Sequence, residues 1–103
     1  MLIRVVKVTA KGVLYSKLIS SDVEALHREL GGPVDNIKLF SDVLTFVRRQ
    51  PNDLHENKLM PGVFGDILFT GGKGSYLSGL SQAQVNNLAL IFGKDLNHGK
   101  ARL

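Results

Sequence analysis

The stretch Ser20–Arg49, SSDVEALHRELGGPVDNIKLFSDVLTFVRR, decides how this chain folds. Ser21 is a good helix cap because its hydroxyl accepts from a backbone N–H, and Glu24 completes a capping box three residues later. Apolar residues then recur at helical spacing, which predicts a helix packed against a sheet. Gly31 tolerates the left-handed conformation that ends helices, so we expect this helix to end at Leu30.

The second half of this stretch reads as a β-hairpin. Two apolar segments, NIKLF (36–40) and VLTFV (43–47), flank Ser41-Asp42, and a two-residue turn there would pair Ile37 with Phe46. One face would then be wholly apolar. The other face carries the apolar side chains Phe40, Val43 and Val47. Since that face is too apolar to be left in water, we expect a second layer or a second subunit to cover part of it.

An N-terminal hairpin is predicted by two β-branched runs, residues 2–10 and 13–19, which Lys11-Gly12 separates. Its basic side chains are Arg4, Lys7, Lys11 and Lys17. We expect Lys7 on the opposite face from Arg4 and Lys17, and we take Arg4 and Lys17 as candidate ligand-binding residues. The alternative is that the lysines protect an edge strand from intermolecular pairing.

A long loop is predicted for residues 50–62, which carry two prolines and many polar side chains. Loops of this length in small domains are often functional. Asp53, His55 and Glu56 are close enough in sequence to suggest a metal site, but no other cluster of ligands supports them. We therefore interpret them as solvated loop residues and expect no metal.

A glycine-rich turn is predicted after a buried strand at residues 66–70. It consists of Gly71, Gly72, Lys73 and Gly74. The spacing does not match a P-loop, which needs a glycine where Ile67 stands and a serine or threonine directly after the lysine. Backbone N–H groups of such a turn could still hold a phosphate beside the lysine. We take the four residues as candidate ligand-binding residues, with a flexible hairpin tip as the alternative.

A second helix is predicted from Ser81, whose capping box with Gln84 is a strong local signal, to Gly93. Leu90 and Ile91 spread the apolar surface round this helix beyond one stripe. They indicate a protein interface such as that of a homodimer, or else a helix wedged between the sheet and a loop. Residues 94–103 are expected to form a basic tail outside a domain of residues 1–93.

Composition narrows the classes of protein. With 103 residues the chain is expected to be one domain, and without cysteine it has no disulfide, thiolate nucleophile or cysteine zinc site. Its formal net charge of +4 favours an anionic partner, although a solvated basic surface explains it equally well. The first residues do not form a signal peptide and no apolar run would span a membrane, so we expect a cytoplasmic protein.

These elements together predict an α+β fold. We expect one domain with an antiparallel or mixed sheet of five or six strands and two helices packed mainly on one face. No cofactor signature occurs, and the three histidines lie far apart in unrelated contexts. The protein is therefore expected to have no catalytic residues and not to be an enzyme.

The order of elements resembles a family of phage and mobile-element proteins, domain of unknown function 3846. The matching features are an N-terminal hairpin, a helix with Glu24-Ala25-Leu26, a strand starting at Gly65-Asp66 and a helix starting at Leu80-Ser81. Family members often carry Gly-Leu-Pro-x-Asn in the central loop, whereas this chain has Leu59-Met60-Pro61-Gly62 without that asparagine. The family defines no catalytic residues. The resemblance implies a small accessory protein that acts by stoichiometric binding, frequently against host defence.

Two hypotheses about function follow. The first is a counter-defence protein that binds an anionic nucleotide signal or a host defence effector such as a nuclease. The alternative is a nucleic-acid-binding accessory or regulatory protein, which the basic charge allows although aromatic and basic residues do not interleave in a stacking motif. Both hypotheses require a binding site and not a catalytic centre.

Overall fold

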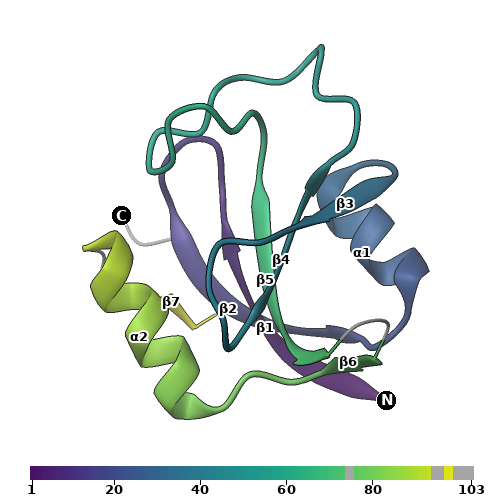
Figure 1. Ribbon diagram of the computed structural model, residues 1–103, viewed down its shortest axis with the longest axis vertical. Helices are drawn as coiled ribbons and strands as arrows, with labels where there is room; N and C mark the ends of the chain where they lie inside the picture. Colours follow the sequence, from purple (N-terminus) through teal and green to yellow (C-terminus); the bar gives the residue numbers. More distant parts are fainter. Residues whose placement is uncertain (74–75, 94–96, 99–103) are drawn as a thin grey trace.

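A β-sheet with one helix on each face forms the body of the computed structural model (Figure 1). The structure describes residues 1–73, 76–93 and 97–98. In chain order the elements are β1 (Leu2–Val8), β2 (Leu14–Ser20), α1 (Val23–Leu30), β3 (Val34–Ile37), β4 (Leu44–Arg48), β5 (Ile67–Lys73), β6 (Tyr76–Ser78), α2 (Gln82–Phe92) and β7 (Asn97–His98). The strand order is β3-β4-β5-β1-β2-β7, with β6 paired to β5. The predicted α+β class is confirmed.

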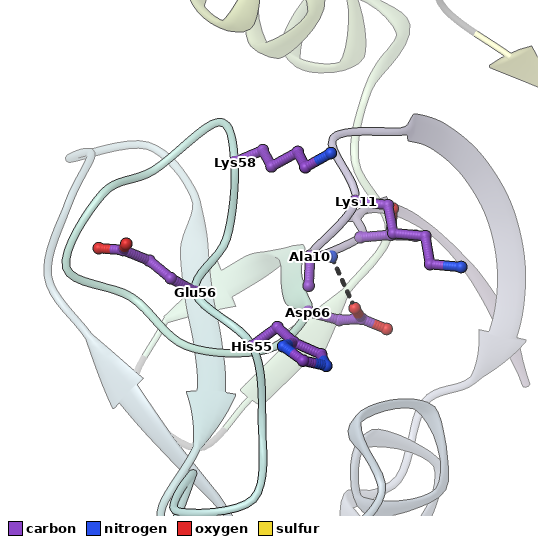
Figure 2. A pocket seen from close by; sticks show the side chains of 7 residues that line it. Ala10, Lys11, His55, Glu56, Lys58 and Asp66 are labelled. Atoms are coloured by element: carbon purple, nitrogen blue, oxygen red, sulfur yellow. Dashed lines mark hydrogen bonds between the residues drawn. The ribbon is translucent and has the colours of Figure 1, made fainter.

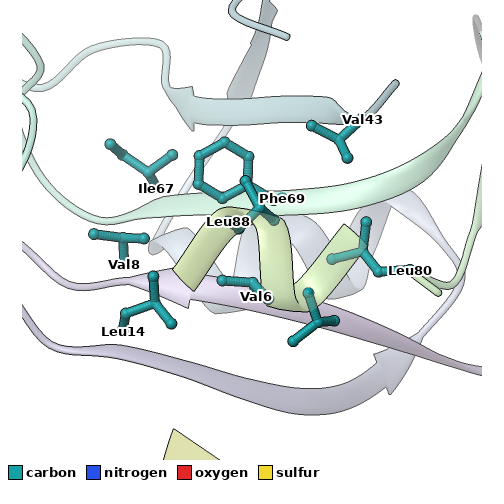
Figure 3. Close-up of a cluster of buried hydrophobic side chains, with 9 residues drawn as sticks. Val6, Val8, Leu14, Val43, Ile67, Phe69, Leu80 and Leu88 are labelled. Atoms are coloured by element: carbon teal, nitrogen blue, oxygen red, sulfur yellow. The ribbon is translucent and has the colours of Figure 1, made fainter. Parts of the chain in front are cut away.

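The two helices cover opposite faces of the sheet, so the prediction that they lie mainly on one face is wrong. On one face α2 packs on Val6, Val8, Ile67 and Phe69, in what we call the α2-side core (Figure 3). On the other face α1 packs on Ile3, Val5 and Leu68, in what we call the α1-side core. Because successive strand residues point to opposite faces, β1 and β5 supply apolar side chains to both cores. The second layer that the sequence predicts over Phe40, Val43 and Val47 is α2.

The N-terminal hairpin forms as predicted, with β1 and β2 antiparallel and Val5 opposite Lys17. Between them, Gly12 has a φ of 92°, a left-handed conformation that glycine adopts without strain. The N–H of Gly12 donates to the Thr9 carbonyl at 2.9 Å. This tight turn holds residues 9–11 at one end of the molecule.

Helix α1 ends as predicted but begins with a different cap. Gly31 is left-handed with a φ of 85°, and its N–H donates to the His27 carbonyl. The N-cap is Asp22 and not Ser21, because the Asp22 carboxylate accepts from the Ala25 N–H at 2.8 Å. The Ser20 hydroxyl also donates to Asp22, at 2.6 Å. The Ser20 hydrogen bond, followed by the helix N–H, lowers the pKa of Asp22 below its ordinary value.

The predicted turn of the β3–β4 hairpin is wrong. Residues 38–43 form the connection, and Ile37 pairs with Thr45 in place of Phe46. This shift by one residue turns the side chains of β3 to the other face relative to β4. It is accommodated because the two faces are both covered: Val43 is buried in the α2-side core, and the Phe40 ring lies 6.0 Å from that of Phe69.

The first three residues of the predicted glycine-rich turn belong to a strand. Gly71, Gly72 and Lys73 belong to β5, where Gly71 pairs with Ser78 and Gly72 with Leu77. A Cβ at Gly71 would lie 2.8 Å from the Gly79 carbonyl oxygen, so a close approach of two backbones explains this glycine. The predicted Gly74 lies outside the described residues, as does the tail at 94–96 and 99–103.

Helix α2 begins with the predicted capping box. The Ser81 hydroxyl accepts from the Gln84 N–H at 3.1 Å, and the Gln84 side chain accepts from the Ser81 N–H at 2.8 Å. Gly93 ends the helix with a φ of 63°. Neither helix in the described part of the chain has the length and apolar character that a membrane crossing requires.

Candidate ligand-binding pocket

A cavity of about 550 Å³ opens where the β1–β2 turn meets the loop of residues 49–66, which joins β4 to β5 (Figure 2). We call it the hairpin-loop pocket. Its lining residues are Thr9, Ala10 and Lys11 from the turn, His55, Glu56 and Lys58 from the loop, and Asp66 just before β5. The pairing of β1 with β5 places these three segments side by side. The pocket is thus built from residues far apart in sequence.

Asn57 fastens the loop to the turn. It is 1% exposed, and its amide nitrogen donates to the carbonyls of Val8, Thr9 and Gly65 at 3.3, 3.2 and 3.0 Å. Its amide oxygen accepts from the Leu59 N–H at 3.0 Å. Moving the loop would leave these buried donors and this acceptor without partners, which costs free energy. The Asn57 amide therefore fixes the position of the loop relative to the turn. The backbones of its neighbours are held as well: the Lys58 N–H donates to the Ala10 carbonyl at 3.0 Å, and the Gly65 N–H donates to the His55 carbonyl at 2.8 Å.

Asp66 is held from two sides. Its Oδ1 accepts from the Ala10 N–H at 2.9 Å, and its Oδ2 lies 3.6 Å from Lys7 Nζ. Lys7 in turn donates to the Glu29 carbonyl at 2.9 Å and lies 3.5 Å from the Glu29 carboxylate. Lys17 completes the chain of charges, with its Nζ 2.9 Å from that same carboxylate. Helix α1 is therefore connected to the wall of the pocket through a partly buried ion network.

The basic side chains of the pocket remain available. Within the described residues, neither Lys11 nor Lys58 forms an ion pair, and both are exposed. Glu56 points away from Ala10 in Figure 2, and its carboxylate accepts from the Gly62 N–H at 2.8 Å. With Glu56 bonded to the loop backbone, two ammonium groups and the His55 ring are left to meet a ligand. Such a set of donors suits an anion.

The candidate residues at the N-terminal hairpin are not brought together. Arg4 pairs with Leu18 and lies on the α2 face, whereas Lys17 pairs with Val5 and lies on the α1 face together with Lys7. The expectation that Lys7 points to the opposite face from Arg4 is therefore confirmed, and the expectation that it also opposes Lys17 is wrong. The Arg4 guanidinium donates to Gln82 at 3.0 Å and not to any group near Lys17.

The other candidates also lie away from the pocket. Gly71, Gly72 and Lys73 are near β6, at the opposite end of the sheet from the hairpin-loop pocket (Figure 1). Their backbones form a ladder with β6, so these three residues do not form the predicted cradle of turn N–H groups. Leu90 and Ile91 are 77% and 55% exposed on α2, as a surface for another molecule requires.

The loop residues weighed as metal ligands diverge. Asp53 is exposed and its carboxylate lies 3.9 Å from Arg48, whereas Glu56 bonds to the Gly62 backbone and His55 lines the pocket. Among the described residues, no three histidine or acidic side chains are close enough to hold a metal ion.

No protein-family model, curated protein or solved structure matches this chain. The resemblance to the phage family consequently stays a prediction. The site residues that sequence reasoning missed are Thr9, Ala10, Lys11, Asn57, Lys58 and Asp66. The available signal was the long polar loop, whose length is typical of functional loops, but only the β1–β5 pairing reveals what that loop faces.

Proposed function

We propose that the protein acts by stoichiometric binding of a small anionic molecule in the hairpin-loop pocket. The observation that carries this proposal is the position of Lys11 and Lys58. They come from two different segments, line one cavity and have no acidic partner among the described residues, while the acidic Asp66 of that cavity is already held by Ala10 and Lys7. Two unpaired ammonium groups beside a concave surface favour a phosphate or carboxylate ligand.

The size of the cavity fits a small organic anion better than a single ion. Pockets for small molecules typically measure roughly 300 to 1,000 Å³, and this one measures about 550 Å³. Its lining also favours binding over catalysis. The Thr9 hydroxyl accepts from the Val13 N–H at 3.1 Å, and the Asp66 carboxylate accepts from Ala10. The hydroxyl that could act as a nucleophile and one carboxylate oxygen are thus engaged in holding the fold.

Isothermal titration calorimetry with AMP tests this proposal. We expect Lys11→Ala with Lys58→Ala to weaken binding at least about 100-fold, because each charge-assisted hydrogen bond contributes roughly 1.5 to 3 kcal/mol. The matched control is Lys38→Ala, an exposed lysine in the β3–β4 connection, which should bind like the wild type. Absence of binding by the wild type, or equal binding by the double variant, would contradict the proposal.

In this proposal, the biological role is that of a counter-defence protein. Sequestration of an anionic nucleotide signal needs only a binding site and enough copies of the protein, which suits a small chain without catalytic machinery. The phage context comes from the family resemblance, and the ligand chemistry comes from the pocket.

A protein partner is the second candidate function, and the surface of α2 favours it. The helix sequence QAQVNNLALIF has no charged residue, and Leu90 and Ile91 are exposed on it. An uncharged surface with two large apolar side chains is typical of a contact with another protein. Binding of a host effector nuclease should be lost in Leu90→Ser with Ile91→Ser and retained in Lys11→Ala with Lys58→Ala; the reverse pattern would reject this candidate.

A further inference from the structure

We propose that the hairpin-loop pocket selects phosphate esters that also carry a hydrogen-bond donor, such as an amino or hydroxyl group. The Asp66 carboxylate accepts the hydrogen bond from this donor. The inference rests on the proposed function, since it names the class of ligand that the same pocket takes. A nucleotide has this combination of groups, with a phosphate at one end and amino or hydroxyl donors at the other.

The two carboxylate oxygens of Asp66 have different surroundings. Oδ1 accepts from the Ala10 N–H at 2.9 Å, which fixes the orientation of the carboxylate. Oδ2 is 3.6 Å from Lys7 Nζ, beyond the usual length of a hydrogen bond. The Asp66 side chain is 33% exposed and lines the cavity. One oxygen is therefore left to accept from a ligand.

Lys7 balances the charge of Asp66 without filling this position. Its ammonium group already donates to the Glu29 carbonyl at 2.9 Å, and only 13% of its side chain is exposed. The positive charge behind Asp66 offsets part of the repulsion that the carboxylate would exert on an anionic ligand. An acidic side chain is thus compatible with a pocket for phosphate esters, provided that the phosphate lies at the lysines.

Basic and acidic groups lie at different ends of the pocket. In Figure 2, Lys58 extends on one side of Ala10, while Asp66 and His55 lie together on the other side. A bound ligand would place its phosphate near Lys58 and its donor near Asp66. A ligand that is anionic at both ends would meet the Asp66 carboxylate and bind less well.

Three nucleotide probes test the inference. They are AMP, purine riboside 5′-monophosphate, which lacks the 6-amino group, and 2′,3′-dideoxyadenosine monophosphate, which lacks the ribose hydroxyls. We expect the wild type to bind at least one of the two truncated probes about 10-fold or more weakly than AMP, because an unpaired carboxylate oxygen remains.

Asp66→Asn should abolish this discrimination. The amide oxygen can still accept from Ala10, so the amide nitrogen, which donates and does not accept, would face the ligand. The AMP preference should therefore fall to about 1-fold. The matched control is Asp35→Asn, an exposed residue of β3 paired with Arg49, which should keep the wild-type preference.

The outcomes separate the inference from the proposed function. If the wild type binds none of the probes, both are refuted. If binding depends on Lys11 and Lys58 but the wild type does not distinguish the probes, or if Asp66→Asn distinguishes them as the wild type does, the inference alone is refuted. The comparison of probes on the wild type needs no variant, so it decides the matter even where Asp66→Asn is unstable.

Discussion

Replacing Asn57 by alanine should destabilise the protein as strongly as a large truncation in the core. Two N–H protons of Asn57 serve three backbone carbonyls at 3.0 to 3.3 Å, and its oxygen accepts from the Leu59 N–H at 3.0 Å. These contacts amount to about three hydrogen bonds at roughly 1 kcal/mol each, so we expect a loss of about 3 kcal/mol. For a domain of this size, that corresponds to a decrease in Tm of roughly 12 to 24 °C.

Urea unfolding followed by far-UV circular dichroism measures this loss. The matched control is Asn52→Ala, an exposed asparagine of the same loop, which should change the free energy of unfolding by less than about 0.5 kcal/mol. AMP binding by Asn57→Ala should weaken as well, because the β1–β2 turn and the loop lose side-chain hydrogen bonds that hold them together. If Asn57→Ala costs no more than Asn52→Ala, the loop is held by other contacts and our account of the pocket wall is wrong.

Two further predictions concern glycines and pH. Gly62 and Gly65 both have positive φ values, 92° and 88°, but a Cβ would meet nothing within 4 Å at Gly62 and would lie 2.6 Å from Leu54 Cδ1 at Gly65. Gly62→Ala should cost about 1 kcal/mol from backbone strain and Gly65→Ala about 2 kcal/mol, and equal costs in urea unfolding would show that Leu54 moves aside freely. The hydrogen bond from the Ser20 hydroxyl, and to a smaller extent that from a helix N–H, lowers the pKa of Asp22 in the folded protein below 3.8. The ionised carboxylate therefore stabilises the fold above pH 3.8, and this stabilisation is lost as the pH falls through the folded pKa. In Asp22→Asn the side chain still caps the helix but does not titrate. The difference in Tm between the wild type and this variant should therefore shrink below pH 3.8, and a difference that stays constant with pH would reject the charged cap.

The ends of both helices were predictable because their signals are local. The left-handed Gly31 and the Ser81 capping box each depend on residues within one helical turn. The start of α1 was missed by one residue because Ser21 and Asp22 are both good caps, and only the backbone geometry shows which one accepts from Ala25.

The register of the β3–β4 hairpin was not predictable in the same way. The sequence interpretation took the register from a two-residue turn at Ser41-Asp42, and the wholly apolar face that this register produces agreed with it. Here helices cover both faces, so Phe46 is buried on one side and Val43 on the other, and apolar character does not distinguish the two registers. The observed pairing of Ile37 with Thr45 is compatible with apolar side chains of the hairpin packing in both cores.

The pocket could not be predicted from the sequence because its residues come together only through long-range strand pairing. Ala10 and Asp66 are 56 residues apart, and their hydrogen bond exists only because β1 and β5 are neighbours in the sheet. No signal near either residue indicates this neighbour. The lysines of the turn and the loop were visible in the sequence, but only the strand order brings both to one cavity.

The burial of β1 between two cores has a consequence for how the chain is made. Val6 and Val8 find their partners in Ile67 and Phe69, and at roughly 5 to 20 residues per second the ribosome needs about 3 to 12 s to synthesise the roughly 60 residues between them. During that interval the first hairpin and α1 can shelter Ile3 and Val5, but the opposite face of the growing chain is bare. This face stays bare until α2 is made, because α2 packs on Val6 and Val8. A pause in translation before α2 should therefore increase aggregation more than a pause after it.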